Sequence, residues 1–138
     1  MSSPLTRMSI TLEENVLRQF DALIKQQGFP SRSEAVKQLI KASLVEQEWE
    51  AGEVVAGVIT FVYDHHKSRI LQELTAKQHD FGAIVLCSQH VHLDHDNCME
   101  NIIVKGPVDE LRALFHALEA IKGIKHSSLS MTTVGCHF

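Results

Sequence analysis

Hydrophobic and polar positions alternate strictly at the start of the chain. Met8, Ile10 and Leu12 lie on one face of a short strand expected over residues 5–12, and polar residues lie on the other face. The spacing then becomes helical. Glu13 and Glu14 suit a helix N-terminus, and Gly28 ends this first helix. Its apolar stripe consists of Val16, Leu17, Phe20, Leu23 and Ile24.

A second helix begins just after Pro30. Ser31-Arg32-Ser33-Glu34 matches a capping box, in which the first serine caps the helix and the glutamate follows three residues later. An apolar stripe continues through Ala35, Val36, Leu39, Ile40 and Leu44. We therefore expect strand–helix–helix over residues 1–50.

After a joint at Ala51-Gly52 the pattern changes again. Apolar runs predict four strands. Stretches with helical spacing predict one helix between the first two strands and another between the last two. The predicted order is strand Val54–Tyr63, a helix around Ile70–Gln78, strands Phe81–Leu93 and Met99–Val104, helix Val108–Ile121, and strand Leu129–Val134. This βαββαβ order is that of a ferredoxin-like, ACT-type domain over residues 53–138, with two helices on one face of a four-stranded sheet. The expected fold class of the whole chain is α+β.

Composition excludes a membrane protein and a general coat for nucleic acid. No apolar run approaches the roughly 20 residues that span a bilayer, and the N-terminus has no signal-peptide core, so we expect a cytoplasmic protein. Its three cysteines are then thiols or ligands rather than disulfides. The net charge of −4 divides into +2 over residues 1–45 and −6 over residues 46–138. The two parts therefore suit different partners.

The N-terminal strand–helix–helix is too small to bury a core and gives its strand no partner. Two copies solve both problems by pairing their strands. The segment resembles a ribbon-helix-helix DNA-binding domain, in which the paired strands enter the major groove of double-stranded DNA. The outward residues would be Arg7, Ser9 and Thr11, which can bond to base edges. Amides near Ser31, Arg32 and Ser33 would bind a phosphate.

Candidate metal-binding residues lie in and just after one predicted strand. His90 and His92 are two residues apart in a strand and therefore point to the same side. A polar turn follows, after which Cys98 can return beside them, and two imidazoles with a thiolate suit a transition metal. Cys87 is a rival ligand in Cys87-x-x-His90-x-His92. Its odd separation from His90 puts it on the opposite face unless a bulge intervenes, so we expect Cys87 to be a small core residue.

Taken together, these features resemble the NikR family of nickel-responsive repressors along nearly the whole chain. The residues that carry the resemblance are His90 through Glu100, Arg32-Ser33-Glu34-Ala35, Tyr63 with the histidine- and lysine-rich turn after it, and Gln78-His79. The resemblance implies a homotetramer, formed as a dimer of dimers, with one Ni(II) per subunit. The ligands would be His90, His92 and Cys98 of one subunit and His79 of a neighbour, with Glu100 supporting them.

The resemblance also implies a function. The chain would not be an enzyme but a repressor of nickel-uptake genes that binds a palindromic operator when Ni(II) is bound. Nickel would order the segment near Tyr63–Lys67, so that Lys67 and Arg69 could reach DNA phosphates. The family also holds a potassium ion with a carboxylate one turn after Glu34. Here Gln38 occupies that place, and the resemblance leaves that ion undecided.

The sequence also fits other interpretations. The metal could be copper or cobalt, because affinity alone favours copper over nickel. An antitoxin that binds DNA and a protein toxin is a second class, and a metalloenzyme is a third, although no base and nucleophile are paired. His65, His66 and His116 could form weaker secondary metal sites.

Overall fold

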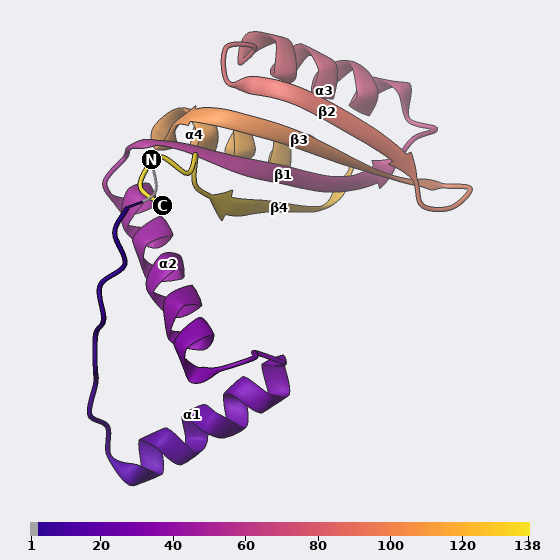
Figure 1. Cartoon of the computed structure of the whole chain (residues 1–138). Helices are drawn as coiled ribbons and strands as arrows, with labels where there is room; N and C mark the ends of the chain where they lie inside the picture. The colour runs from indigo at the N-terminus through magenta and orange to yellow at the C-terminus, as the bar shows by residue number, and fades with distance from the viewer. Residues whose placement is uncertain (1–2) are drawn as a thin grey trace. The chain divides into compact units, whose positions relative to one another are not determined.

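The computed structural model describes residues 3–138 (Figure 1). The chain divides into two compact units, the first ending at Ala42 and the second beginning at Ser43. The elements in chain order are α1 Glu14–Gln27, α2 Arg32–Glu50, β1 Val54–Asp64, α3 Ser68–Asp80, β2 Val85–His92, β3 Asn97–Pro107, α4 Val108–Glu119 and β4 Ile124–Thr132. The expected domain limits at residues 50 and 53 stay a prediction.

Local chemistry fixes the two N-terminal helices. Gly28 ends α1 in the left-handed conformation, with φ of 73°, which glycine adopts without strain. Ser31 Oγ caps α2 by accepting a hydrogen bond from the Glu34 amide at 3.1 Å, as half of the expected capping box. The Arg32 guanidinium donates to both carboxylate oxygens of Asp21 at 2.8 Å and so joins α2 to α1.

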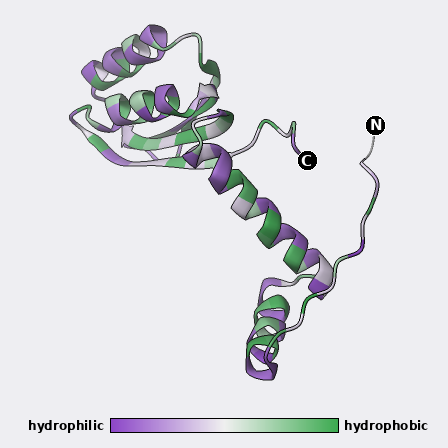
Figure 2. Cartoon of the chain, turned by 90° about the vertical axis from the view of Figure 1, so that its left-hand side faces the viewer, coloured by the Kyte–Doolittle hydropathy of each residue, from purple (hydrophilic) through white to green (hydrophobic). Residues whose placement is uncertain are grey.

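The expected strand over residues 5–12 is not formed in the single chain. Residues 3–13 have no regular secondary structure. A ribbon strand needs the backbone of another strand as its hydrogen-bond partner, and here that partner would belong to a second copy. Met8 and Ile10, which alternate toward the expected interior, are accordingly exposed. Apolar segments of α1 and α2 also reach the surface (Figure 2).

The second unit is one antiparallel sheet with the strand order β2-β3-β1-β4. Both helices, α3 and α4, cover the same face (Figure 1), which confirms the ferredoxin-like prediction. Every second residue of β1 and β3 points toward these helices and is buried. The side chains with almost no exposure include Val55, Ile59, Phe61, Tyr63, Leu74, Cys98, Ile102, Val104, Leu111, Leu114 and Leu118. The opposite sheet face is more open.

Three strands have boundaries that differ by two residues or more from the sequence prediction. Residues 81–84 form turns rather than the start of a strand, so β2 begins at Val85. β3 begins at Asn97, two residues earlier than expected, because Asn97 pairs with Asp64 of β1. β4 covers residues 124–132 rather than 129–134, since its polar residues also pair along β1. Cross-strand pairing, which polarity alone does not report, decides all three.

Candidate metal centre and nucleic-acid interface

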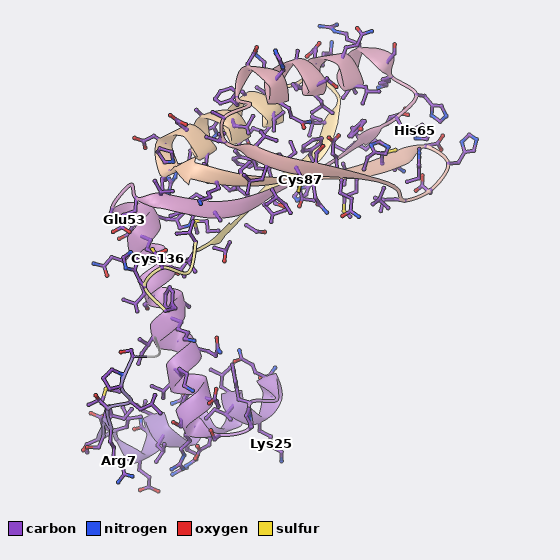
Figure 3. The ribbon with its side chains drawn as sticks, turned by 45° about the horizontal axis from the view of Figure 1, so that its top comes forward. Arg7, Lys25, Glu53, His65, Cys87 and Cys136 are labelled. Atoms are coloured by element: carbon purple, nitrogen blue, oxygen red, sulfur yellow. The ribbon has the colours of Figure 1, made fainter. Side chains whose placement is uncertain are left out.

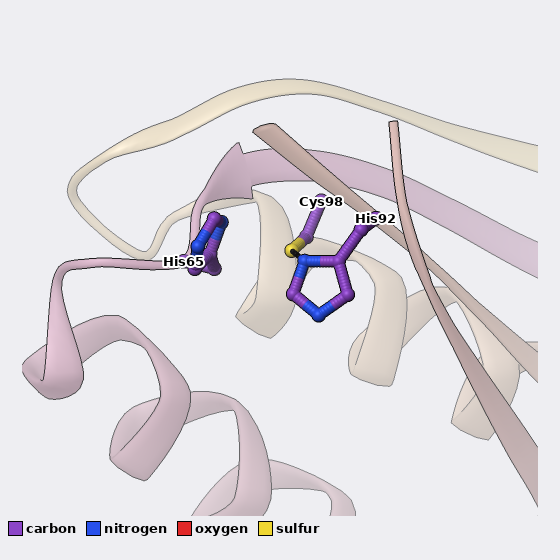
Figure 4. Close-up of side chains that lie close together, drawn as sticks. All are labelled: His65, His92 and Cys98. Carbon is purple, nitrogen blue, oxygen red and sulfur yellow. Dashed lines mark hydrogen bonds between the residues drawn. The ribbon is translucent and has the colours of Figure 1, made fainter. Parts of the chain in front are cut away.

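Strand register brings His90, His92 and Cys98 to one side of the sheet. His92 pairs with Cys98 and His90 with Glu100, and these positions share the helix-covered face. Cys98 Sγ lies 3.3 Å from His92 Nδ1. Figure 4 shows the two side chains next to each other. The ring centroids of His90 and His92 are 5.1 Å apart. One buried sulfur and two rings therefore converge at the end of β2, as the sequence predicted.

The structure adds His65, which the sequence had suggested only for a weaker secondary metal site. Its ring centroid is 4.8 Å from that of His92, and Figure 4 shows His65 beside the His92–Cys98 pair. One ligand atom from each of His65, His92 and Cys98 lies within 4.8 Å of the other two. His65 Nδ1 is buried and has no hydrogen-bond partner among residues 3–138. The missed signal was the pairing of Tyr63 with Cys98, which directs the next residues toward the site.

A partly buried hydrogen-bond network holds the ring of His90, whose side chain is otherwise exposed. The Tyr63 hydroxyl lies 3.0 Å from His90 Nδ1 and 3.3 Å from Glu100 Oε2, and Gln78 Nε2 donates to Glu100 Oε1 at 3.0 Å. Burial raises the pKa of Tyr63, and the neighbouring Glu100 carboxylate raises that pKa further, so the phenol stays protonated. Because Nδ1 is occupied by this contact, Nε2 is the nitrogen that His90 can offer to a metal. Glu100 therefore contacts His90 through Tyr63, and its role in supporting a metal ligand stays a prediction.

The thiol of Cys98 is suited to a metal rather than to exposed redox chemistry. It is fully buried, and burial raises its pKa, with Asp64, Asp94 and Glu100 adding to the effect. Metal binding deprotonates such a thiol and neutralises the resulting thiolate. A thiolate, imidazole nitrogens and an orphaned buried nitrogen are donors that Ni(II) accepts. The residues present therefore fit a nickel ion.

The predicted role of His79 stays untested in one chain, and the predicted place of Cys87 is corrected. His79 lies exposed in the last turn of α3 and joins no group of metal-binding side chains within the described residues of one chain. Its role as a ligand from a neighbouring subunit stays a prediction. Cys87, expected in the core, is exposed, which corrects that expectation. The irregular pairing of β2 with β3 lies between Val85 and Cys87, and the register is regular from Cys87 onward. Cys87, opposite Ile103, therefore lies on the open face of the sheet, and His90 lies on the face covered by the helices. Cys87 is marked in Figure 3.

Further histidines gather at the same end of the sheet. His66 Nδ1 lies 3.0 Å from Asp64 Oδ1, and His66, His95 and Asp96 form an exposed group. Hydrogen bonds from His66 hold the pKa of Asp64 below its usual value. His116 instead contacts Glu119 of its own helix at 2.8 Å. The region around the candidate metal centre is thus rich in imidazole and carboxylate.

The residues expected to contact DNA lie at the surface. Arg7, Ser9 and Thr11 are exposed in the segment before α1 (Arg7 is marked in Figure 3), and Ser31 and Ser33 are exposed at the start of α2. Arg32 is also exposed, although its guanidinium is held by Asp21, and this ion pair lowers the pKa of Asp21. Lys67 precedes α3, and Arg69 donates to Glu73 at 2.8 Å. Within the described chain no helix is both long and apolar enough to cross a bilayer.

Comparisons with known proteins agree with this division of the chain. Residues 6–47 match the family described as "Ribbon-helix-helix protein, copG family", and residues 56–132 match "NikR C terminal nickel binding domain". A protein of Syntrophus aciditrophicus named "Putative nickel-responsive regulator" is 44% identical over 133 residues, covering 96% of this chain and 97% of its own length. One of the same name from Nitratidesulfovibrio vulgaris (strain DSM 19637 / Miyazaki F) is 47% identical over 130 residues, covering 94% of each chain.

A solved structure shows the fold of the second unit independently. An uncharacterized protein of Thermotoga maritima superposes with a TM-score of 0.53 at 16% identity, covering 59% of this chain and all of that one. The family of the whole chain follows from the sequence relatives and from the two matched domains. The chain belongs to the NikR family of nickel-responsive regulators, with a ribbon-helix-helix domain followed by a nickel-binding domain.

Proposed function

We propose that this protein is a transcriptional regulator whose affinity for operator DNA rises when Ni(II) occupies the His92–Cys98 centre. The observation that carries the proposal is the 3.3 Å approach of the buried Cys98 Sγ to Nδ1 of the exposed His92. A thiolate with imidazole nitrogens in one plane favours Ni(II) or Cu(II), whereas Zn(II) favours a tetrahedron. His90 is the third ligand of this proposal, through its Nε2.

The fourth ligand of the proposed site is His79 of a neighbouring subunit in a homotetramer. An exposed histidine in the last turn of α3 is available to another chain. Metal would then join subunits as well as fill a site. His65 is the competing fourth ligand, because it stands next to His92 and Cys98 within the same chain.

Mixing two inactive variants distinguishes these ligands. His79→Ala subunits still offer His90, His92 and Cys98, and Cys98→Ala subunits still offer His79. If the ligand comes from a neighbour, an equal mixture regains about a quarter of the wild-type nickel–thiolate absorption, because random pairing completes that share of sites. If His65 is the fourth ligand, the His79→Ala protein alone keeps the full band.

The DNA-binding form we propose is a pair of N-terminal units. Met8 is 64% exposed and Ile10 57% exposed in one chain, which a second copy would cover when the strands pair. Arg7, Ser9 and Thr11 would then face the major groove, and the start of α2 would face phosphates. Two such pairs would bind the half-sites of a palindrome and repress nickel-uptake genes.

The proposed switch lies at the turn between β1 and α3. His65 and His66 in this turn adjoin the metal centre, and Lys67 and Arg69 follow directly. A metal that fixes the turn would also fix these two cations, which could then contact DNA phosphates. Nickel would in this way favour the arrangement of the protein that binds DNA.

The direct experiment is DNA binding by fluorescence anisotropy on a candidate operator, with Ni(II) and with a chelator. We expect nickel to raise the affinity of the wild-type protein and to leave the His92→Ala variant unaffected. Equal DNA affinity with and without metal, in a protein that binds one nickel per chain, would refute the switch. An equal response to Cu(II) would support the copper alternative.

A further inference from the structure

A second group of metal-binding side chains lies where α2 meets β1, far along β1 from the nickel centre. Glu48, Glu53 and His137 each offer a ligand atom, and these three atoms all lie within 4.8 Å of one another. Glu53 and the tail residue next to His137, Cys136, lie in the same region in Figure 3. All three residues belong to the second compact unit.

Glu48 supplies the observation that points to a ligand. Its side chain is buried, with 7% exposure, and neither carboxylate oxygen has a hydrogen-bond partner within the described part of the chain. A carboxylate that is buried without partners loses its hydration and is costly to keep charged. A bound cation would remove that cost. The adjacent ion pair, His137 Nε2 to Glu53 Oε2 at 3.5 Å, leaves Glu48 unpaired.

The backbone holds the two glutamates in place. Gly52, with φ of 75°, turns the chain between α2 and β1. The Glu53 amide donates to the Glu48 carbonyl at 3.2 Å, and the Glu53 carbonyl accepts from the Val108 amide at 3.3 Å. The arrangement of Glu48 and Glu53 is therefore built into the connection and does not depend on the tail.

The tail is folded toward the same place. The Trp49 indole donates to the Thr132 carbonyl at 2.9 Å and so fixes the end of β4 against α2. The Gly135 amide donates to Thr133 Oγ1 at 3.1 Å, and Gly135 has a positive φ of 81° that turns the chain before His137. The imidazole reaches the glutamates through this turn.

We propose that Glu48, Glu53 and His137 form a second metal site, which binds a divalent transition ion such as Zn(II). One imidazole nitrogen and two carboxylate oxygens are donors that Zn(II) accepts, and two carboxylates balance its charge. Three protein ligands leave room for water. The bound ion ties the C-terminal tail to the junction of α2 and β1.

Zn(II) binding by the full-length protein tests the site. The background variant is Cys98→Ala, which weakens the nickel centre. In equilibrium dialysis followed by elemental analysis, we expect Glu48→Gln and His137→Ala each to lose one zinc per chain. Glu50→Gln and His126→Ala, two exposed positions outside the group, should keep it. Equal zinc content in all five proteins would overturn the proposal. A Cys98→Ala background protein that binds no zinc, although Glu48, Glu53 and His137 are intact, would also overturn it.

Trp49 gives a second readout, because it is the single tryptophan and directly follows Glu48. Co(II) at the proposed site should quench its fluorescence, and the quenching should disappear in the His137→Ala variant. Co(II) at the nickel centre would lie at the other end of the eleven-residue β1, on the order of 35 Å away, and would quench weakly. Unchanged fluorescence on saturation with Co(II) would contradict the site, whatever happens at the nickel centre.

Stability provides a check that does not depend on occupancy alone. In chelator, Glu48→Gln should melt at or above the wild-type temperature, because the unpartnered charge is gone. Zn(II) should then raise the melting temperature of the wild type but not of the variant. A Glu48→Gln protein that is less stable than wild type in chelator would indicate an ordinary structural role and contradict the proposal.

Discussion

Removing one hydroxyl group, in Tyr63→Phe, should weaken nickel binding without unfolding the domain. Tyr63 is fully buried, and its ring packs in the core beside Phe61, so phenylalanine keeps the packing. The lost oxygen lies 3.0 Å from His90 Nδ1 and 3.3 Å from Glu100 Oε2. The ring of His90 then loses the contact that directs its Nε2 toward the metal.

The structure sets the size of both effects. The bond to Glu100 involves a buried carboxylate but is long, so its loss costs about 1.5 kcal/mol of unfolding free energy. For a domain of this size that corresponds to a fall of roughly 6–12 °C in melting temperature. Glu100 keeps its bond from Gln78, which limits the damage. Loss of a group that orients a metal ligand lowers metal affinity by about 10- to 100-fold.

Competition with a chelator of known nickel affinity measures the loss of nickel affinity. Thermal unfolding in the presence of chelator measures the loss of stability. The matched control is Thr60→Val in β1, the strand that also carries Tyr63. This change removes the 2.9 Å hydrogen bond from Thr60 to Asn101 of the neighbouring strand β3. Its position alternates with Tyr63 to the other sheet face. We expect Thr60→Val to lose stability while it binds nickel normally. Wild-type nickel affinity in Tyr63→Phe would show that His90 is not oriented by this contact, and would refute the reasoning.

Three further outcomes are expected. Arg7→Ala should weaken specific DNA binding about tenfold or more in an anisotropy titration while nickel affinity stays unchanged; a parallel loss of both would contradict the separation of the two domains. Cys98→Ala should abolish the thiolate-to-nickel absorption band, and a retained band would instead implicate Cys87. The Asp21–Arg32 pair lowers the pKa of Asp21, so its contribution to stability is present above pH of about 4 and is lost as pH falls through the folded-state value. Arg32→Ala should therefore reduce the loss of stability on acidification in a pH series of thermal melts, and an unchanged acid profile would show that the pair contributes nothing.

Periodicity predicted most of the fold because each predicted element buries a face that its own sequence marks. The capping serine and the terminal glycine of the first two helices are local signals, and the structure bears them out. The strand over residues 5–12 has a clean alternation too. It does not form in one chain, because strands are stabilised by a partner that no sequence pattern contains.

The candidate metal site shows the same limit at the level of side chains. His90 and His92 share a face by strand geometry alone, and a turn was enough to return Cys98 to them. His65 could not be found in that way. Its place beside His92 depends on the register of β1 with β3, in which Tyr63 pairs with Cys98. Cys87 was misassigned to the core because apolar neighbours in the sequence gave no sign that this face of the sheet is open.

Nickel K-edge X-ray absorption of the nickel-loaded protein, compared with that of His79→Ala, tests the proposed centre most directly. We expect the spectrum of planar nickel coordinated by three nitrogen atoms and one sulfur atom. In the variant the spectrum should change, because one imidazole ligand is lost. A spectrum without sulfur, or a tetrahedral one that is identical in the two proteins, would contradict a nickel site built from Cys98 and the histidines of two subunits.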